Sequence, residues 1–292
     1  MAEKVSHTAA KAASKWRAGL RPLFRNRLVL FGVVIILGMV AAAVFASLLA
    51  PYDPTEMRVR DALKPPSAAH LFGTDRFGRD VLSRTIYGSR IALWVALSSI
   101  TTALLVGSVL GLISGFWGGW LDLAIGRIMD VLFSFPTLIL AIAIAAMLGP
   151  GLNNAALAIA VVYAPLFSRV ARGPVIAERE KEHVAAATAL GARSFRIIFR
   201  HILPNVIAPV IVQASVALAF AILSEASLSY LGLGTQPPDP SWGTMLNEGR
   251  TYLETAPWMS VFPGFAIMLA VFGFNLLGDG LRAVFDPRLR GH

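Results

Sequence analysis

The sequence predicts an all-α membrane protein with six transmembrane helices. Of its 292 residues, 56% are hydrophobic and only 15% are charged, whereas about a quarter of the residues of a soluble domain are charged. The mean hydropathy is correspondingly high, at +0.65. Apolar runs of membrane-spanning character recur along the chain between polar segments. The six expected spans are residues 28–50, 91–117, 131–148, 152–168, 206–224 and 259–278.

The composition argues against several classes of function. The chain has no cysteine, which excludes disulfides, thiolate catalysis and cysteine metal sites. Its five histidines are scattered without HExxH spacing, so we expect no metal site and no zinc hydrolase. No nucleophile–base pair indicates an enzyme. The net charge of +9 comes from basic residues beside apolar segments, which favours contact with membrane lipid over binding of nucleic acid.

The first two segments are a basic tail and a membrane span. Residues 1–27 are rich in lysine and arginine, and they fit either a short helix on the inner leaflet or a disordered tail. The apolar run 28–50 is longer than the apolar core of a signal peptide, so we interpret it as the first transmembrane helix. Residues 51–90 then form a proline-punctuated loop, and residues 91–292 hold a five-helix core.

The distribution of lysine and arginine sets the expected orientation. With both termini in the cytoplasm, most of the basic residues lie on the inner side, as the positive-inside rule requires. Residues 51–90 are then extracytoplasmic and residues 169–205 cytoplasmic. The exception is the 51–90 loop, which holds seven basic residues on the outer side.

A stripe of small residues marks the second span. Gly107, Gly111 and Gly115 recur at every fourth position, which lets another helix approach closely in lipid. We expect this stripe to be a helix-packing face, with a sister subunit as its natural partner.

The polar segment 182–205 has the pattern of two short helices joined at Gly191, because glycine readily adopts the positive φ that ends a helix. Pro204 either stops the second helix or lies in the first turn of the next one. The second helix is amphipathic, with an apolar stripe on one face and arginines on another. These residues are Phe195, Ile198, Phe199 and Ile202 on the first face and Arg193, Arg196 and Arg200 on the second.

The expected spans contain no charged residue and no histidine, with Glu225 and Asp279 at their boundaries. A self-powered carrier usually needs an ionisable group inside the membrane. Residues 73–80 have the GxxxxG spacing of a P-loop but lack the following Lys and Ser/Thr. If transport is driven, the energy therefore comes from another chain, and residues 182–205 are the candidate surface that receives it.

The 73–80 segment has two open interpretations, a turn-rich structural loop and a docking surface for an external partner. For the second interpretation, the candidate residues that dock a binding protein are Asp75, Arg79, Asp80 and Trp242. The polar residues of the spans could line a path or bond another helix. They are Asn153, Asn154, Gln213, Ser215 and Asn275.

Residues 182–205 resemble the EAA loop of ABC importer permeases, in which EAA, three residues and Gly precede a stretch ending near His-x-x-Pro-Asn. The motif glutamate falls on Ala185, so its contact is absent or supplied elsewhere, for example by Glu182. Three further blocks resemble the C-type permease subunit of dipeptide, oligopeptide and nickel importers. They are HLFGTDRFGRDVLSRTIYGSRIAL (70–93), LSYLGLGTQPPDPSWGTML (228–246) and FNLLGDGLRAVFDPRLR (274–290).

The resemblance implies a type I importer permease fold in a bacterial inner membrane. It implies a heterodimer with a B-type permease, two cytoplasmic ATPase subunits that bind ATP and magnesium, and an extracytoplasmic binding protein. The permease itself binds no cofactor and performs no covalent chemistry. By similarity the 182–205 segment is the coupling helix. The residues assigned to this role are Ala185, Ala186, Gly191, Arg193, Arg196, His201, Pro204 and Asn205.

Three alternatives stay open. Arg193, Arg196 and Arg200 fit contacts to lipid headgroups as well as contacts to an ATPase. Asp279 and Arg282 are expected to be structural anchors at the inner membrane surface, where they could pair or cap the sixth span. The cargo stays open among dipeptides, longer peptides, nickel chelates, glutathione-like compounds and sugar conjugates, and the competing function is a self-contained channel or secondary carrier.

Overall fold

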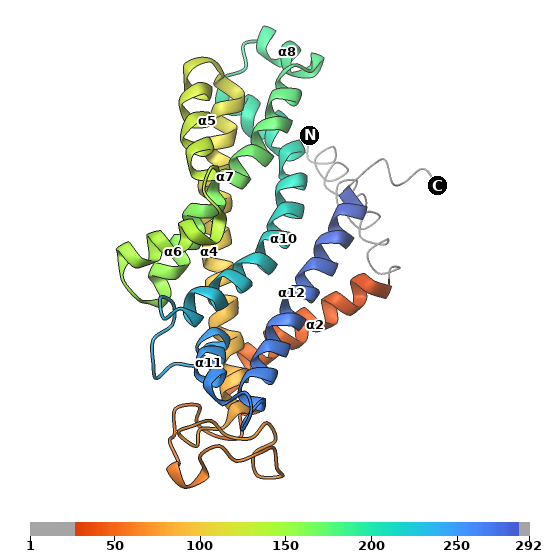
Figure 1. Ribbon diagram of the computed structural model, residues 1–292. Coiled ribbons are helices and arrows are strands. Elements are labelled where there is room, and N and C mark those ends of the chain that lie inside the picture. Colours follow the sequence, from red (N-terminus) through yellow and green to blue (C-terminus); the bar gives the residue numbers. More distant parts are fainter. Residues whose placement is uncertain (1–26, 286–292) are drawn as a thin grey trace.

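A computed structural model describes residues 27–285, so the basic tail expected at 1–27 lies outside the described residues except for Arg27. The described part is a bundle of long helices with a short helical elbow at one end and an irregular loop at the other (Figure 1). Its α-helices are α2 (Arg27–Val44), α3 (Ala46–Leu49), α4 (Val81–Trp117), α5 (Gly119–Phe133), α6 (Thr137–Leu148), α7 (Leu152–Arg179), α8 (Glu182–Ala189), α9 (Ser194–Ile197), α10 (Leu203–Tyr230), α11 (Trp242–Gly249) and α12 (Trp258–Phe285). A π-turn, η2 (Ile198–Ile202), joins α9 to α10, and single 3₁₀ turns lie at Val59–Asp61 and Arg250–Tyr252.

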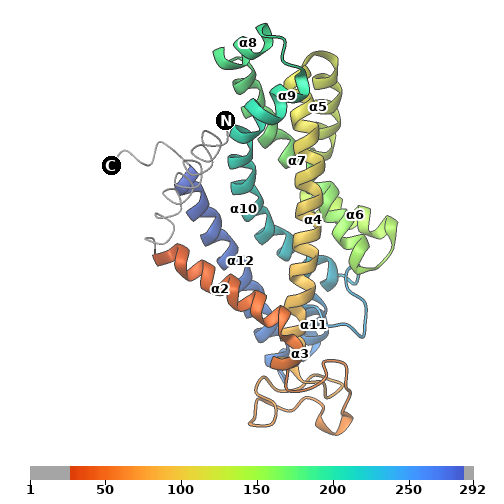
Figure 2. The same cartoon turned by 180° about the vertical axis from the view of Figure 1, so that it is seen from behind.

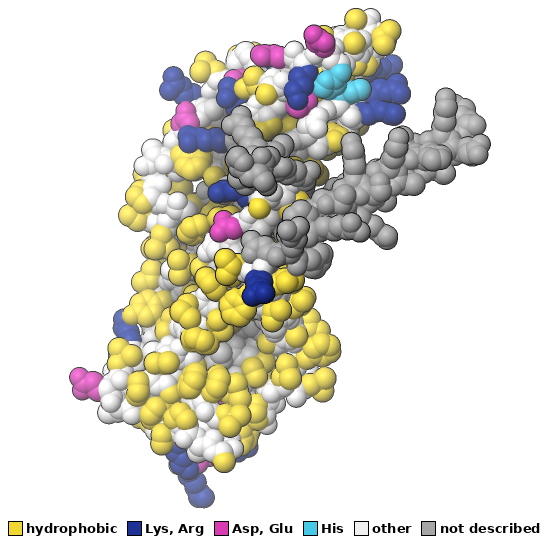
Figure 3. Space-filling model, turned by 90° about the vertical axis from the view of Figure 1, so that its right-hand side faces the viewer, with side chains coloured by type: hydrophobic (Ala, Val, Ile, Leu, Met, Phe, Trp, Pro, Cys, Tyr) yellow, Lys and Arg dark blue, Asp and Glu magenta, His cyan; other side chains and the backbone are white. Residues whose placement is uncertain are grey.

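The membrane-spanning character predicted from the sequence is confirmed. Among the described residues, five helices are long and apolar enough to cross a membrane, and the pair α5–α6 adds a sixth span if it is counted as one. Hydrophobic side chains cover the middle of the molecule, whereas basic and histidine side chains gather at the end that carries the elbow (Figure 3). This is the surface of a protein that lies in a bilayer with one polar end beyond it.

The third span differs from the expected continuous helix 131–148. The chain bends by 93° between α5 and α6. Pro136 precedes the first residue of α6, and proline has neither a backbone N–H nor the freedom to continue α5. The result is a broken span whose two halves both pack on α7, with α5 also contacting α4 and α6 also contacting α10.

The second span begins at Val81, earlier than the expected Ile91. The carboxylate of Asp80 accepts hydrogen bonds from the backbone N–H and the hydroxyl of Ser83, both at 2.8 Å. Asp80 is therefore the N-cap of α4, and the extracytoplasmic loop of the sequence analysis ends ten residues before its expected boundary.

The glycine stripe packs within this chain, and the expectation of a sister subunit as its partner is wrong. A Cβ on Gly107 would lie 2.2 Å from the carbonyl oxygen of Ala164, and one on Gly111 would lie 2.3 Å from that of Ser168. A Cβ on Gly115 would lie 2.9 Å from the Val175 side chain. Because these positions carry no side chain, α4 and α7 lie against each other along their length.

Seen from both sides, α2 and α12 lie on one side of the bundle and α5 and α6 on the other, with α10 between them (Figures 1 and 2). The sixth span, α12, packs on α10 and on α2. The two polar ends are therefore connected by helices that run the whole length of the molecule.

Candidate functional site

The 182–205 segment forms the predicted elbow at one end of the bundle. Gly191 has the expected positive φ of 78°. Its N–H donates to the Thr188 carbonyl at 2.9 Å, and the N–H of Ala192 donates to the Ala187 carbonyl at 3.0 Å. This pair of hydrogen bonds is a Schellman motif, which ends α8 and turns the chain toward α9.

The second helix of the elbow runs directly into α10. Pro204 lies in the first turn of α10, where proline does not interrupt hydrogen bonding, so the second of its two expected placements is confirmed. A helix that continues from the elbow into a membrane span can carry a displacement of the elbow into the bundle.

The apolar stripe of this helix is divided between the interior and the surface. Ile198 and Ile202 are buried, whereas Phe195 exposes 73% of its surface and its ring lies 4.4 Å from that of Phe199. Leu190, in the turn before Gly191, is 89% exposed. Three large apolar side chains are thus exposed at the polar end of the molecule, an arrangement that is typical of a contact surface for another protein.

Arginines surround these aromatic rings. A shallow groove on the elbow is lined by Arg193, Phe195, Arg196, Phe199 and Arg200. The arginines and the two phenylalanines therefore share one surface, which differs from the separate faces expected from the helical spacing.

A buried carboxylate stands behind the elbow, and the sequence analysis missed it. Glu178, near the end of α7, has a side chain that is only 9% exposed. It accepts hydrogen bonds from the Asn205 amide at 3.1 Å and from the Lys181 ammonium, and the His183 imidazole lies 3.9 Å away. One carboxylate thus connects α7, α8 and α10.

The remaining elbow residues lie around this carboxylate or at the surface. The His201 ring lies 6.0 Å from that of His183, and the His201 carbonyl accepts a hydrogen bond from Asn205. Ala185 and Ala186 are exposed on α8, as is Glu182. The acid that contacts the neighbouring helices is therefore Glu178, and Glu182 does not take this place. The only signal for Glu178 in the sequence is its i, i+3 spacing to Lys181.

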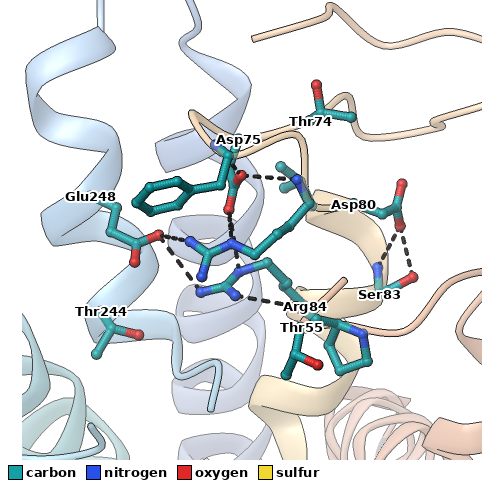
Figure 4. Close-up of polar contacts among 12 residues, drawn as sticks. Thr55, Thr74, Asp75, Asp80, Ser83, Arg84, Thr244 and Glu248 are labelled. Carbon is teal, nitrogen blue, oxygen red and sulfur yellow. Dashed lines mark hydrogen bonds and ion pairs between the residues drawn. The ribbon is translucent and has the colours of Figure 1, made fainter. Parts of the chain in front are cut away.

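At the opposite end, buried ion pairs bind the 50–80 loop to α4 and α11 (Figure 4). The Arg79 guanidinium donates to Asp75 at 2.5 Å and to Glu248 at 2.6 Å. Arg84 lies 3.7 Å from Asp75 and 3.6 Å from Glu248, and it also donates to the Pro54 carbonyl at 3.2 Å. The charges of two guanidinium groups and two carboxylates therefore neutralise one another in a site that is largely shielded from water.

The four residues expected to dock a binding protein all belong to this buried region. Asp75, Arg79, Asp80 and Trp242 each expose 3% or less. Asp80 binds His70 at 2.9 Å, and the Trp242 indole donates to the Thr85 carbonyl at 2.9 Å. Side chains buried this deeply offer no contact surface to another protein, so the structure contradicts direct docking through them and supports the interpretation as a structural loop.

Two carboxylates of the same loop, the exposed Asp53 and the half-buried Asp61, accept hydrogen bonds from neighbouring side chains. Hydrogen bonds from Thr55 lower the pKa of Asp53, and a hydrogen bond from Lys64 lowers the pKa of Asp61. Both carboxylates therefore stay charged at neutral pH, and their contacts are lost only when the pH falls through the lowered pKa values.

Two charged sites differ from their expected surroundings. Glu225, which was placed at the boundary of the fifth span, lies inside α10 and is completely buried, with one carboxylate oxygen accepting from the Ser229 hydroxyl at 2.7 Å.

Asp279 and Arg282 are exposed on α12, and no ion pair joins these two described residues within 4.0 Å. They are therefore free to meet water or lipid headgroups.

Membrane-crossing helices, a polar elbow that continues into a span and an opposite end held by buried ion pairs define a helical multi-pass membrane protein with two different ends. Chains of the methionine ABC transporter MetNI, solved in inward-facing conformations, have the same fold. They match with TM-scores of 0.57 and 0.56 at 19% and 21% identity, over 70% of this chain and 97% and 96% of theirs.

The family follows from comparison of sequences. Residues 107–291 match the family described as "Binding-protein-dependent transport system inner membrane component". Residues 14–66 match the N-terminal transmembrane domain of oligopeptide transport permease C. The chain therefore belongs to this family: it is a multi-pass membrane protein and the permease subunit of an ABC importer, of the C type.

Curated relatives agree over nearly the whole chain. The dipeptide transport system permease protein DppC of Alkalihalophilus pseudofirmus is 48% identical over 96% of this chain and 92% of its own length. The glutathione transport system permease protein GsiD of Pectobacterium atrosepticum is 41% identical over 94% and 92%. The di/tripeptide transport system permease protein DppC of Pseudomonas aeruginosa is 45% identical over 91% and 89%. The resemblance drawn from the sequence is confirmed.

Proposed function

We propose that this permease carries small peptides or closely related solutes into the cytoplasm and that the elbow is the point where ATP hydrolysis drives it. The names of the relatives, which include dipeptide, di/tripeptide and glutathione systems, support this class of cargo. Because one relative is named as a glutathione transport permease, the proposed class of cargo includes modified peptides.

The proposed assembly contains this chain, a B-type sister permease, two cytoplasmic ATPase subunits that hold ATP and magnesium, and an extracytoplasmic binding protein. Both termini and the elbow lie in the cytoplasm, and the 50–80 loop and α11 lie outside. The concentration of basic side chains at the elbow end supports this orientation.

The observation that carries the proposal is the exposed apolar surface of the elbow. Leu190, Phe195 and Phe199 are exposed at a polar end of the chain, where the burial of apolar surface against a partner would stabilise a complex. The proposed partner is an ATPase subunit, and the arginines of the same groove add charge that its surface can complement.

The test compares Gly191→Pro with Gly191→Asn in the reconstituted complex. Proline requires a φ near −65° and cannot adopt the positive φ of Gly191, whereas asparagine tolerates this region. We expect Gly191→Pro to insert into the membrane and keep ATP hydrolysis but lose ATP-driven uptake, and Gly191→Asn to keep most of both. Undiminished uptake by Gly191→Pro would show that the elbow is not the coupling element.

A further inference from the structure

A hollow with both apolar and hydroxyl-bearing walls lies where the broken span meets α7 and α10. Its volume is about 460 Å³. Leu138 and Phe220 form part of its apolar wall. The polar groups that line it come from three helices: Thr137 from α6, Tyr163 from α7, and Ser224 and Ser227 from α10.

The hydroxyl groups of this hollow keep acceptor capacity. Ser224 donates to the Phe220 carbonyl and Ser227 to the Leu223 carbonyl, both at 2.8 Å and both within α10. A serine that donates within its own helix still has oxygen lone pairs for a second partner. The Tyr163 side chain lines the same hollow and carries a further hydroxyl group. The wall can therefore accept hydrogen bonds from the N–H groups of a solute.

A second hollow of about 450 Å³ lies closer to the elbow, between α4, α5 and α7, and carries charges of both signs. Arg172 binds Asp122 through two hydrogen bonds of 2.6 Å, and Asp122 also accepts from Ser114. Arg169 binds Asp130 at 2.7 Å. The second pair is the more accessible one, with 53% and 58% of its side chains exposed.

The two hollows meet at Arg169. Its guanidinium lies over the ring of Phe133, 4.1 Å from the centroid, and Phe133 lines the first hollow while Arg169 lines the second. Along α7 the order is Tyr163, Arg169 and then Glu178 behind the elbow. The two hollows therefore lie in sequence along a helix that leads to the elbow.

We infer that these hollows form this chain's wall of the solute path, and that the Arg169–Asp130 pair opens to bind the carboxylate and the ammonium of a zwitterionic peptide. Both partners are exposed, so exchanging their mutual ion pair for solute charges requires little loss of stability. A free peptide carries one charge of each sign, and the guanidinium can hold a carboxylate with two hydrogen bonds. This inference rests on the proposed function and adds the residues that meet the cargo.

Single-cysteine labelling tests the path. The chain has no native cysteine, so Ser227→Cys places a thiol that is unique in this chain in the first hollow, and Thr251→Cys places one on the exposed turn Arg250–Tyr252, outside the membrane spans. In the complete complex we expect a charged maleimide to label position 227 and a pool of alanine di- and tripeptides to slow this reaction during ATP turnover. We expect the same reagent to label position 251 at a rate that the peptides leave unchanged.

Two outcomes of the labelling would overturn the inference. If position 227 reacts in the isolated chain but not in the assembled complex, a sister subunit covers the hollow. If it reacts only with a lipid-soluble maleimide, the hollow faces the bilayer.

Charge variants test the pair. Arg169→Gln should lower uptake of the free peptides by about tenfold, the effect of one lost charge-assisted hydrogen bond, but should affect their C-terminal amides much less. Asp130→Asn should give the same contrast with N-acetylated peptides. Each rate is divided by that of the unaltered complex with the same solute, so the selectivity of the binding protein cancels.

The charge variants also separate this inference from the proposed function. Equal losses for free and blocked peptides would assign the pair a purely structural role and overturn the inference. An unaltered complex that accumulates no peptide under ATP turnover would overturn the proposed function instead.

Discussion

Glu178 is the residue that joins the elbow to the rest of the bundle. Its carboxylate is almost fully buried and binds Lys181, the residue before α8, and Asn205 at the start of α10. A buried carboxylate with several donors fixes the position of each donor. In this permease, those donors lie on both sides of the Gly191 turn, so the contact holds the elbow in one orientation relative to α7 and α10.

We predict that Glu178→Ala loosens the elbow while leaving the bundle folded. The substitution removes the carboxylate that accepts from the Asn205 amide and the Lys181 ammonium, and because both donors also reach solvent, each lost hydrogen bond costs about 0.5–1.5 kcal/mol of local stability. Hydrogen exchange should become faster across residues 182–205 only, and the uptake per ATP hydrolysed should fall in the reconstituted complex. Glu182→Gln, an exposed acid on the same elbow, is the matched control and should change neither. If hydrogen exchange across residues 182–205 is equally fast in both variants, Glu178 does not hold the elbow in place.

At the scale of single residues, backbone requirements were predictable and burial was not. The position of Gly191 between two helical patterns was enough to predict its positive φ, because the reason is local. Asp75, Arg79 and Asp80 looked like surface residues because charged side chains are rarely buried. Their burial depends on Glu248, which lies far away in the sequence and reaches Arg79 only in the folded chain.

At the scale of helices, the contact between α4 and α7 depends on positions without side chains. We predict that Gly111→Ala destabilises the permease, because the added methyl would lie 2.3 Å from the Ser168 carbonyl and force the helices apart, which costs about 1–3 kcal/mol. Gly38→Ala on α2 is the matched control, since no atom lies within 4 Å of its added methyl. Thermal unfolding in detergent should show a lower midpoint for Gly111→Ala only. A midpoint unchanged by Gly111→Ala would mean that the two helices separate at no cost.

The order of the membrane spans was predictable, whereas the helices α5 and α11, the breaks and the packing partners were predictable only in part or not at all. Apolar runs located the spans because backbone groups in lipid must be satisfied within a helix. The early start of α4 had a local signal in Asp80 and Ser83, and the break before α6 had one in Pro136. The partner of the glycine stripe had no local signal, since a small-residue face fits α7 and a sister subunit equally well.

On the scale of the whole molecule, the buried ion pairs make the outer loop, α4 and α11 one unit. We predict that Arg79→Met destabilises this unit by about 3–5 kcal/mol, because it leaves Asp75 and Glu248 with one guanidinium between them. The double variant Arg79→Met, Glu248→Gln should recover part of the loss, as a double-mutant cycle on thermal unfolding would measure. Purely additive losses would show that the two side chains do not interact.

The charges of the complete chain also bear on the competing function of a self-contained carrier. A carrier that couples to protons needs a titratable group that the path can reach. Glu225 is completely buried beside Ser229 and lines neither of the two hollows, while the acids of the second hollow, Asp122 and Asp130, are paired with arginines. Among residues 27–285, the acids that line the two hollows are thus ion-paired with arginines in this structure, and the exposed elbow offers an external source of energy a point of contact.

We therefore predict that the purified chain in liposomes accumulates no peptide, either with a pH gradient or with ATP. Addition of the sister permease, the ATPase subunits and the binding protein should give uptake that requires ATP hydrolysis. The same complex built with Gly191→Pro is the control, because it contains every subunit and differs only at the elbow. Radiolabelled peptide inside the vesicles measures the result. Accumulation by the chain alone under a pH gradient would favour a secondary carrier, and Glu225 would then be the first residue to substitute.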